Sequence, residues 1–160
     1  MESEERLTRA VEQYGQELLR YCHHILCDYH EAQDAVQTAF LKAWERAGSL
    51  PPGEELRPWL YRVCYTTCMD TLRRRKRAEN LRPAQPDRDT DYMGPELRQA
   101  LGQLTAQERA LIFQRVMEGW GYRELEAVYR IPAATLRKRY ERAKDKLARL
   151  LTEQEVEHEA

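Results

Sequence analysis

The sequence GYRELEAVYRIPAATLRKRYERAKDKLARLL, residues 121–151, decides the fold class. Its apolar residues recur at helical spacing in two blocks, which are Tyr122, Leu125 and Val128, then Leu136, Tyr140, Ala143, Leu147 and Leu150. The tight connection between the blocks contains Pro132, and proline cannot continue a helix. A short helix, a tight turn and a second helix are typical of a helix-turn-helix, which lays its second helix in the major groove of DNA.

The outward face of this second helix carries the predicted DNA contacts. If Leu136 and Tyr140 face inward, the positions opposite them are polar or basic. The candidates are Thr135, Arg137, Lys138, Arg139 and Arg142. Arginine pairs bidentately with guanine, and both lysine and arginine neutralise phosphates. The alternative is an ordinary solvated helix that touches no nucleic acid.

The rest of the chain also shows helical periodicity. Helices are expected at about residues 5–27, at 31–47 and from Arg57 onward, with a loop rich in proline and glycine at 48–53. Residues 78–95 show no periodicity, so packing there would not repay the ordering entropy. Beyond them, Thr105 and Glu108 have the spacing of a capping box.

We therefore predict an all-α protein with two small helical domains joined by a flexible linker. The predicted boundaries are 1–77 for the first domain, 78–95 for the linker, 96–151 for the helix-turn-helix domain and 152–160 for an acidic tail. Because the tail is polar and strongly acidic, we expect it to be disordered.

The net charge of −1 over 160 residues conceals a segregation of charge along the chain. Residues 1–56 carry −6, whereas residues 57–82 carry +6 and residues 96–151 carry +5. Such asymmetry predicts two surfaces that meet a polyanion, and others that meet a basic protein or are solvated.

Several protein classes are excluded by what the sequence lacks. No stretch has the roughly 18 consecutive apolar residues of a membrane helix, and the start shows no signal pattern, so we expect a cytoplasmic protein without membrane insertion. No Gly-rich phosphate loop and no nucleophile beside a convincing base occur. We predict no enzyme, no catalytic residue and no cofactor.

The stretch RPWLYRVCYTTCMDTLRRRKR, residues 57–77, interleaves aromatic with polar residues and ends in five basic ones. Such a helix suits stacking with unpaired bases together with phosphate contact. The candidate residues are Trp59, Arg62, Tyr65, Thr66, Met69, Arg73, Arg74 and Arg77. The alternative is that Trp59 and Tyr61 only close a small core.

The stretch EAQDAVQTAFLKAW, residues 31–44, leaves Asp34, Gln37, Leu41 and Lys42 toward solvent once its apolar stripe faces inward. An exposed leucine beside acidic and amide groups indicates a protein interface. A simply solvated helix face is the alternative.

In chain order, residues 31–44, then 57–77, then 101–147 (LGQLTAQERALIFQRVMEGWGYRELEAVYRIPAATLRKRYERAKDKL) resemble a bacterial extracytoplasmic-function (ECF) sigma factor, and the resemblance covers residues 5–151. The resemblance implies a first domain that binds the RNA polymerase core and the minus-ten promoter element, and a second domain that binds the minus-thirty-five element. Asp34, Gln37, Leu41 and Lys42 would contact the largest polymerase subunits. The candidates at 59–77 would contact the minus-ten element, and those at 135–142 the minus-thirty-five element.

The resemblance implies further features. The loop at 46–56 would cradle an extruded promoter base, at a cost of a few kcal/mol that stacking offsets. The linker, with Asp87, Asp89 and Asp91, would enter the polymerase channels, although a plain polar tether explains the same composition. An anti-sigma factor is a plausible partner. The chain departs from the family at Tyr65-Thr66, where Arg-Asn is common, and at Ala134, where Gly is common, so we expect a divergent promoter sequence.

The four cysteines raise the question of a metal site. Cys22, His23, Cys27 and His30 are spaced so that a metal is conceivable, but without a fourth ligand at zinc-like spacing we predict no metal and reduced thiols. Cys64 and Cys68 are expected in the core.

The alternatives to a sigma factor are an autonomous helix-turn-helix regulator that binds operator DNA without polymerase, and a polymerase adaptor that has lost promoter specificity.

Overall fold

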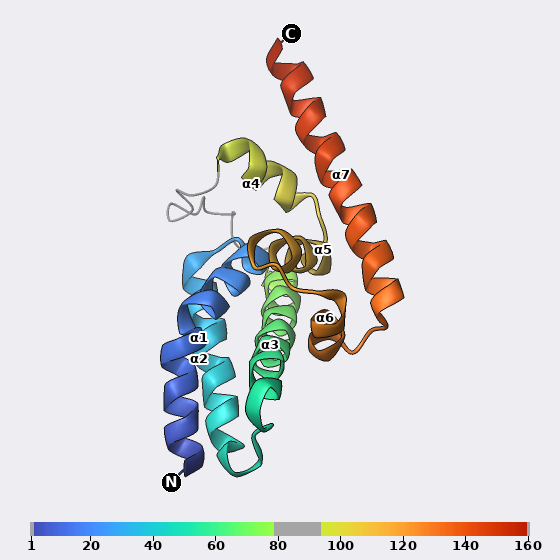
Figure 1. The fold of residues 1–160 in the computed structure, drawn as a ribbon. Coiled ribbons are helices and arrows are strands. Elements are labelled where there is room, and N and C mark those ends of the chain that lie inside the picture. The colour runs from blue at the N-terminus through green and yellow to red at the C-terminus, as the bar shows by residue number, and fades with distance from the viewer. Residues whose placement is uncertain (1, 79–93, 160) are drawn as a thin grey trace.

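The computed structural model describes residues 2–78 and 94–159, and within them the chain is helical and has no strand (Figure 1). The N-terminal half contains α1 (Glu2–Leu26), α2 (Tyr29–Glu45) and α3 (Leu56–Ala78), with single 3-10 turns at Ala47–Ser49 and Gly53–Glu55 between α2 and α3. The C-terminal half contains α4 (Pro95–Gly102), α5 (Ala106–Ile112), the π-helical turn Phe113–Met117, α6 (Tyr122–Tyr129) and α7 (Ala133–Glu159). The all-α prediction is confirmed. The predictions about the linker concern residues outside the described ranges, except at its two ends.

The N-terminal half is a bundle of α1, α2 and α3, which lie side by side (Figure 1). Helix α2 contributes mainly alanines to the core, and these small side chains let its neighbours approach closely. Asp28 begins α2 as its N-cap, because its carboxylate accepts a hydrogen bond from the backbone N–H of Glu31 at 2.9 Å. Arg75 of α3 pairs with Glu31 and donates to the backbone oxygen of Leu26, which ties the end of α3 to the α1–α2 turn.

The C-terminal half forms the predicted helix-turn-helix from α6 and α7. Helix α5 begins with the predicted capping box, in which Thr105 and Glu108 each accept a hydrogen bond from the other's backbone N–H. Helix α6 ends at Tyr129, and the following residue, Arg130, has a left-handed backbone (φ 53°) that turns the chain toward α7. Leu136, fully buried, then anchors the first turn of α7.

The two halves pack on each other and share one hydrophobic core. Helices α5 and α6 lie between α3 and α7, and α5 also contacts α1 (Figure 1). Core residues contributed by the C-terminal half include Leu111, Phe113, Trp120, Leu125, Val128 and Tyr129. Helical periodicity predicts that each of these helices has a buried face, but it does not predict which helix covers which.

Arg109 of α5 joins the halves through its buried guanidinium group. Its Nε and Nη2 donate to the backbone oxygen of Ile25, at 3.0 and 2.6 Å, and Ile25 lies in the last turn of α1. Its Nη1 donates to the backbone oxygens of Leu101 and Leu104, at 3.2 and 2.6 Å. Arg109 therefore satisfies carbonyls at the C-terminal ends of two helices, groups that lack partners within their own helix.

Helix α7 is longer than the sequence indicates. It continues through Glu159, so the prediction of a disordered tail is wrong for the backbone of residues 153–159. At 27 residues it spans about 40 Å, and its C-terminal end projects beyond the rest of the molecule (Figure 1). None of the helices that the structure describes is both long and apolar enough to cross a membrane.

The buried Arg109 gives a prediction about stability. Arg109→Leu removes four hydrogen bonds and takes away the donors that Arg109 supplies to the carbonyls of Ile25 and Leu104, whereas the Leu101 carbonyl keeps the backbone N–H of Leu104 at 3.1 Å, so the free energy of unfolding should fall by about 2–4 kcal/mol. Urea unfolding followed by circular dichroism measures it, with Arg123→Leu, an exposed position on α6, as the control. Equal unfolding midpoints for the two variants would contradict the role given to Arg109.

Candidate nucleic-acid and protein interfaces

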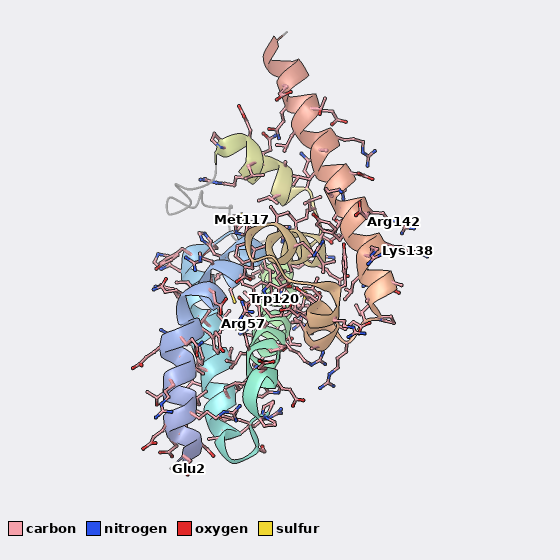
Figure 2. The ribbon with its side chains drawn as sticks, in the orientation of Figure 1. Glu2, Arg57, Met117, Trp120, Lys138 and Arg142 are labelled. Atoms are coloured by element: carbon pink, nitrogen blue, oxygen red, sulfur yellow. The ribbon has the colours of Figure 1, made fainter. Side chains whose placement is uncertain are left out.

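The basic face of α7 is exposed. Arg137, Lys138, Arg139 and Arg142 are exposed, and Thr135 is half-buried. Figure 2 shows Lys138 and Arg142 on the outer side of α7, pointing away from α5 and α6. The structure thus brings the five residues predicted from the sequence onto about two turns of helix at the surface.

Two of these arginines are held in place by neighbouring helices. Arg139 donates from Nη1 to the side-chain oxygen of Gln107 in α5, at 2.6 Å. The guanidinium of Arg137 lies over the ring of Tyr122 in α6, 5.0 Å from its centroid. Lys138 and Arg142 make no hydrogen bond or ring contact of this kind among the described residues, so they are the side chains most available to a ligand.

The C-terminal part of α3 presents a second basic surface. Arg73, Arg74 and Arg77 are exposed, as the sequence predicts, although Arg73 is paired with Asp70 at 3.0 Å. Lys76 is exposed as well and belongs with them, whereas Arg75 is turned toward Glu31. The basic run alone does not distinguish these, because the difference comes from the packing of α3 on the α1–α2 turn.

The middle of α3 is covered by the C-terminal half. The ring of Tyr65 stands edge-on to Tyr129 of α6, with centroids 4.9 Å apart, and Met69 packs against the shared core. Arg62 donates to the backbone oxygen of Val128 at 3.4 Å. Thr66 remains exposed. Three of the predicted minus-ten residues therefore lie at the boundary between the halves and not on an open helix face.

A cavity of about 470 Å³ lies beside this boundary, between α2, α3 and the α6–α7 turn. Its lining residues are Lys42, Glu45, Arg46, Trp59, Arg62, Val63, Thr66 and Arg130, so four cations face one carboxylate. Burial and the positive charge of Arg130 lower the pKa of Arg62. The cations outnumber the carboxylate, and the ring of Trp59 lies among them. The cavity therefore suits a nucleotide whose base stacks on the ring while its phosphates contact the cations. Lys42, predicted as a polymerase contact, reaches this cavity and donates to Thr67 at 3.1 Å.

Helix α2 has an exposed face that sequence analysis found only in part. Asp34, Gln37 and Leu41 are exposed, and Leu41 keeps 66% of its surface accessible. Trp44, one turn further on, is 47% exposed and was not predicted to belong to this face. Residues three apart on a helix are neighbours, so Leu41 and Trp44 form an apolar spot beside polar groups.

A cluster of polar and aromatic side chains lies where the halves meet, around Arg57 and Trp120 (Figure 2). Arg57 of α3 donates twice to Glu17 of α1, at 3.1 and 2.8 Å, and its guanidinium lies 4.5 Å from the centroid of the Trp120 ring. The hydroxyl of Tyr61 is 2.5 Å from a carboxylate oxygen of Glu118 and 3.2 Å from one of Glu17. Nothing in the spacing of these residues indicates that they meet.

The two glutamates of this cluster have opposite pKa shifts. Burial raises the pKa of Glu118 to about 7, and the nearby carboxylate of Glu17 adds to the shift. Burial also acts to raise the pKa of Glu17, but the hydrogen bonds and charge of Arg57 outweigh it, so the pKa of Glu17 is lowered. Glu118 thus holds a proton more tightly than an ordinary glutamate does.

The cysteines form no metal centre in the residues 2–78 and 94–159. Cys22 is fully buried, and hydrogen bonding with Cys64 and Cys68, followed by burial, raises its thiol pKa. Cys27 lies apart at the left-handed end of α1 (φ 57°) and is the only cysteine that is not fully buried. None of the four cysteines, all of which lie in the described residues, forms a disulfide.

This arrangement predicts the order in which the thiols react. A maleimide reagent at neutral pH should label Cys27 at least about ten times faster than Cys22, Cys64 and Cys68, because reaction needs an accessible thiolate. Peptide mass spectrometry measures the labelling of each site, and Cys27→Ser should remove the fast phase. Equal rates at the four positions would show that the core is open.

Comparison with known proteins places both halves in the same family. The family model for sigma-70 region 2 matches residues 10–78, and that for sigma-70 region 4 matches residues 95–147. CarQ, an RNA polymerase sigma factor of Myxococcus xanthus, is 30% identical over 135 residues, which cover 79% of this chain and 78% of CarQ. The ECF sigma factor SigG of Mycobacterium tuberculosis is 36% identical over 67 residues, but these are 42% of this chain and only 18% of SigG.

The fold is also that of a solved sigma factor. RpoE of Bartonella quintana, crystallised in complex with the anti-sigma factor NepR, superposes with a TM-score of 0.73 at 22% identity, over 91% of this chain and 96% of that chain. Both sigma-70 regions are present in order, and a sigma factor matches across about four fifths of its own length. The chain belongs to the extracytoplasmic-function (ECF) sigma factors of RNA polymerase.

Proposed function

We propose that this protein joins the RNA polymerase core, directs it to specific promoters and helps to melt the minus-ten region. The observation that carries the proposal is the outward basic face of α7, on which Arg137 and Arg139 are positioned by neighbours while Lys138 and Arg142 extend to solvent. Preorganised arginines lose little side-chain entropy on binding DNA. Sigma factors are non-enzymatic initiation factors, so promoter opening is a binding reaction, and its site of action would be the cytoplasm.

The minus-ten element would bind along α3 and in the cavity beside it. The exposed Arg73, Arg74 and Arg77 suit phosphate contacts, and Trp59 in the cavity suits stacking with an extruded base. Arg62 and Lys42 would neutralise the phosphates that accompany such a base. Arg130 of the C-terminal half lines the same cavity, so full access to it requires the α6–α7 turn to move.

The polymerase core would bind the exposed face of α2. Asp34, Gln37 and Leu41 support a contact with the largest subunits, and the exposed Trp44 extends it. Aromatic residues often dominate the binding energy of protein interfaces. We also propose an anti-sigma factor as a partner, since the related RpoE was crystallised with one. Matches to both sigma-70 regions favour this function over an autonomous operator-binding regulator.

Transcription with purified polymerase core tests the function. Multi-round reactions on a library of bacterial promoter fragments should give promoter-specific transcripts only when this protein is added. If no transcripts appear while the protein alone binds particular fragments tightly, the protein is an autonomous regulator.

A double variant tests the role of α7. Lys138→Glu with Arg142→Glu should reduce transcription from a promoter that depends on its minus-thirty-five element by at least about 100-fold, because each reversed charge repels phosphate. Binding to the polymerase core, measured by co-elution, should stay unchanged. The matched control is Arg149→Glu, an exposed charge two turns further along α7. Equal loss of core binding would contradict the division of roles between the halves.

A further inference from the structure

The contact between the two halves contains a carboxyl group that needs a proton. The hydroxyl of Tyr61 lies within hydrogen-bond distance of two carboxyl groups, 2.5 Å from Glu118 and 3.2 Å from Glu17. A phenol has one proton and donates it to one acceptor. Two carboxyl groups that share this one donor repel each other when both are charged, so the contact favours a proton on one of the glutamates.

The surroundings assign that proton to Glu118. Glu17 receives two hydrogen bonds from the guanidinium of Arg57, which stabilise its ionised form. Glu118 has no such cation, and its Oε1 is buried without a hydrogen-bond partner among the described residues. A charged carboxylate would be costly there, whereas a carboxylic acid is tolerated.

The proton lies between the two halves of the chain. Glu118 belongs to the C-terminal half, while Tyr61, Arg57 and Glu17 belong to the N-terminal half. The same contact covers Tyr65 with Tyr129 and places Arg130 over the cavity that holds Trp59. If the function proposed above holds, the closed arrangement blocks the surface that would read the minus-ten element.

We propose that protonated Glu118 is a latch that holds the two halves closed over α3, and that loss of its proton opens the α3 face to single-stranded DNA. The latch controls the open-to-closed ratio of the protein when it is not bound to polymerase or DNA. Binding of the promoter strand and loss of the proton then favour the same open state.

The direction of the pH effect follows from the two states. In the open state Glu118 faces water and regains an ordinary pKa near 4.5, whereas in the closed state its pKa is about 7. The latch is therefore fully effective below pH 4.5 and is lost as the pH rises through about 7, and the open-to-closed ratio should rise about 30-fold between pH 5.5 and 8.5.

The other charged or titratable groups around Glu118 do not reverse the direction of this pH effect. They are Glu17 from α1, Arg57 and Tyr61 from α3, and Tyr129 from α6. Arg57 and Glu17 keep their charges across this range, because each favours the ionised form of the other. Burial raises the pKa of both tyrosines further above 10, so they stay neutral.

The buried thiols report the opening, and Glu118→Gln supplies the reference. Glutamine has nearly the shape of the protonated acid, accepts from Tyr61 in the same way and offers a donor group, but it does not titrate. Cys68 is fully buried and lies close to Tyr21, Tyr65 and Tyr129, so the rate of its labelling by a dithiodipyridine follows the open fraction. Dividing the rate in the full wild-type chain by that in Glu118→Gln cancels the intrinsic pH dependence of the thiol.

We expect this ratio of rates to increase about 30-fold from pH 5.5 to pH 8.5, and the control Glu12→Gln, an exposed position on α1, to match the wild type. Carbon-13 NMR of labelled glutamate should show one carboxyl titrating near pH 7 that is absent from Glu118→Gln. At pH 8.5 a single-stranded dT20 oligonucleotide should bind Glu118→Gln more weakly than the wild type.

A ratio that does not change with pH, or a Glu118 that titrates near its ordinary value, overturns the latch. Equal dT20 affinities overturn the claim that closure covers the DNA-binding face. None of these measurements uses polymerase, so failure of the transcription assay and failure of the latch are separate results.

Discussion

The structure depends on the guanidinium of Arg109. One side chain binds the end of α1 through Ile25 and the end of α4 through Leu101 and the following Leu104, so two helix ends from different halves are fixed around the start of α5. A buried cation is costly to desolvate, and here the cost is offset by four hydrogen bonds to carbonyl oxygens. Because the guanidinium reaches carbonyls of both helix ends at once, this arrangement specifies how the halves are oriented as well as that they meet.

The rest of the boundary between the halves is polar at its centre, which distinguishes it from an ordinary domain core. The hydroxyls of Tyr21 and Tyr129 meet at 2.8 Å, Tyr129 also donates to Gln114, and Tyr61 bridges Glu17 and Glu118. Buried polar groups favour the one packing that satisfies all of them, yet each can also be satisfied by water once exposed. Such a boundary is specific when closed, and water can satisfy its polar groups if the halves separate.

Much of the fold was predictable from local pattern, whereas the boundary between the halves was not. Helical periodicity, Pro132 and the Thr105–Glu108 spacing each report on a few neighbouring residues, and the structure confirms the elements they indicate. Contacts such as Tyr65 with Tyr129 join residues that are far apart in sequence, and no periodicity encodes them. The basic residues of α7 were found because exposure there follows directly from the register of one helix. Glu118 was missed since its environment comes from three helices.

The length of α7 has a mechanical consequence. The helix begins just after the left-handed turn at Arg130, and the proposed DNA-reading positions lie in its first three turns, whereas its acidic end lies about 40 Å from that turn (Figure 1). A rotation of about 10° around the turn moves the far end by roughly 7 Å but the proposed reading residues by only about 1–3 Å. Helix α7 thus acts as a lever whose pivot is next to the proposed DNA face, so its tip is displaced several times further than those residues.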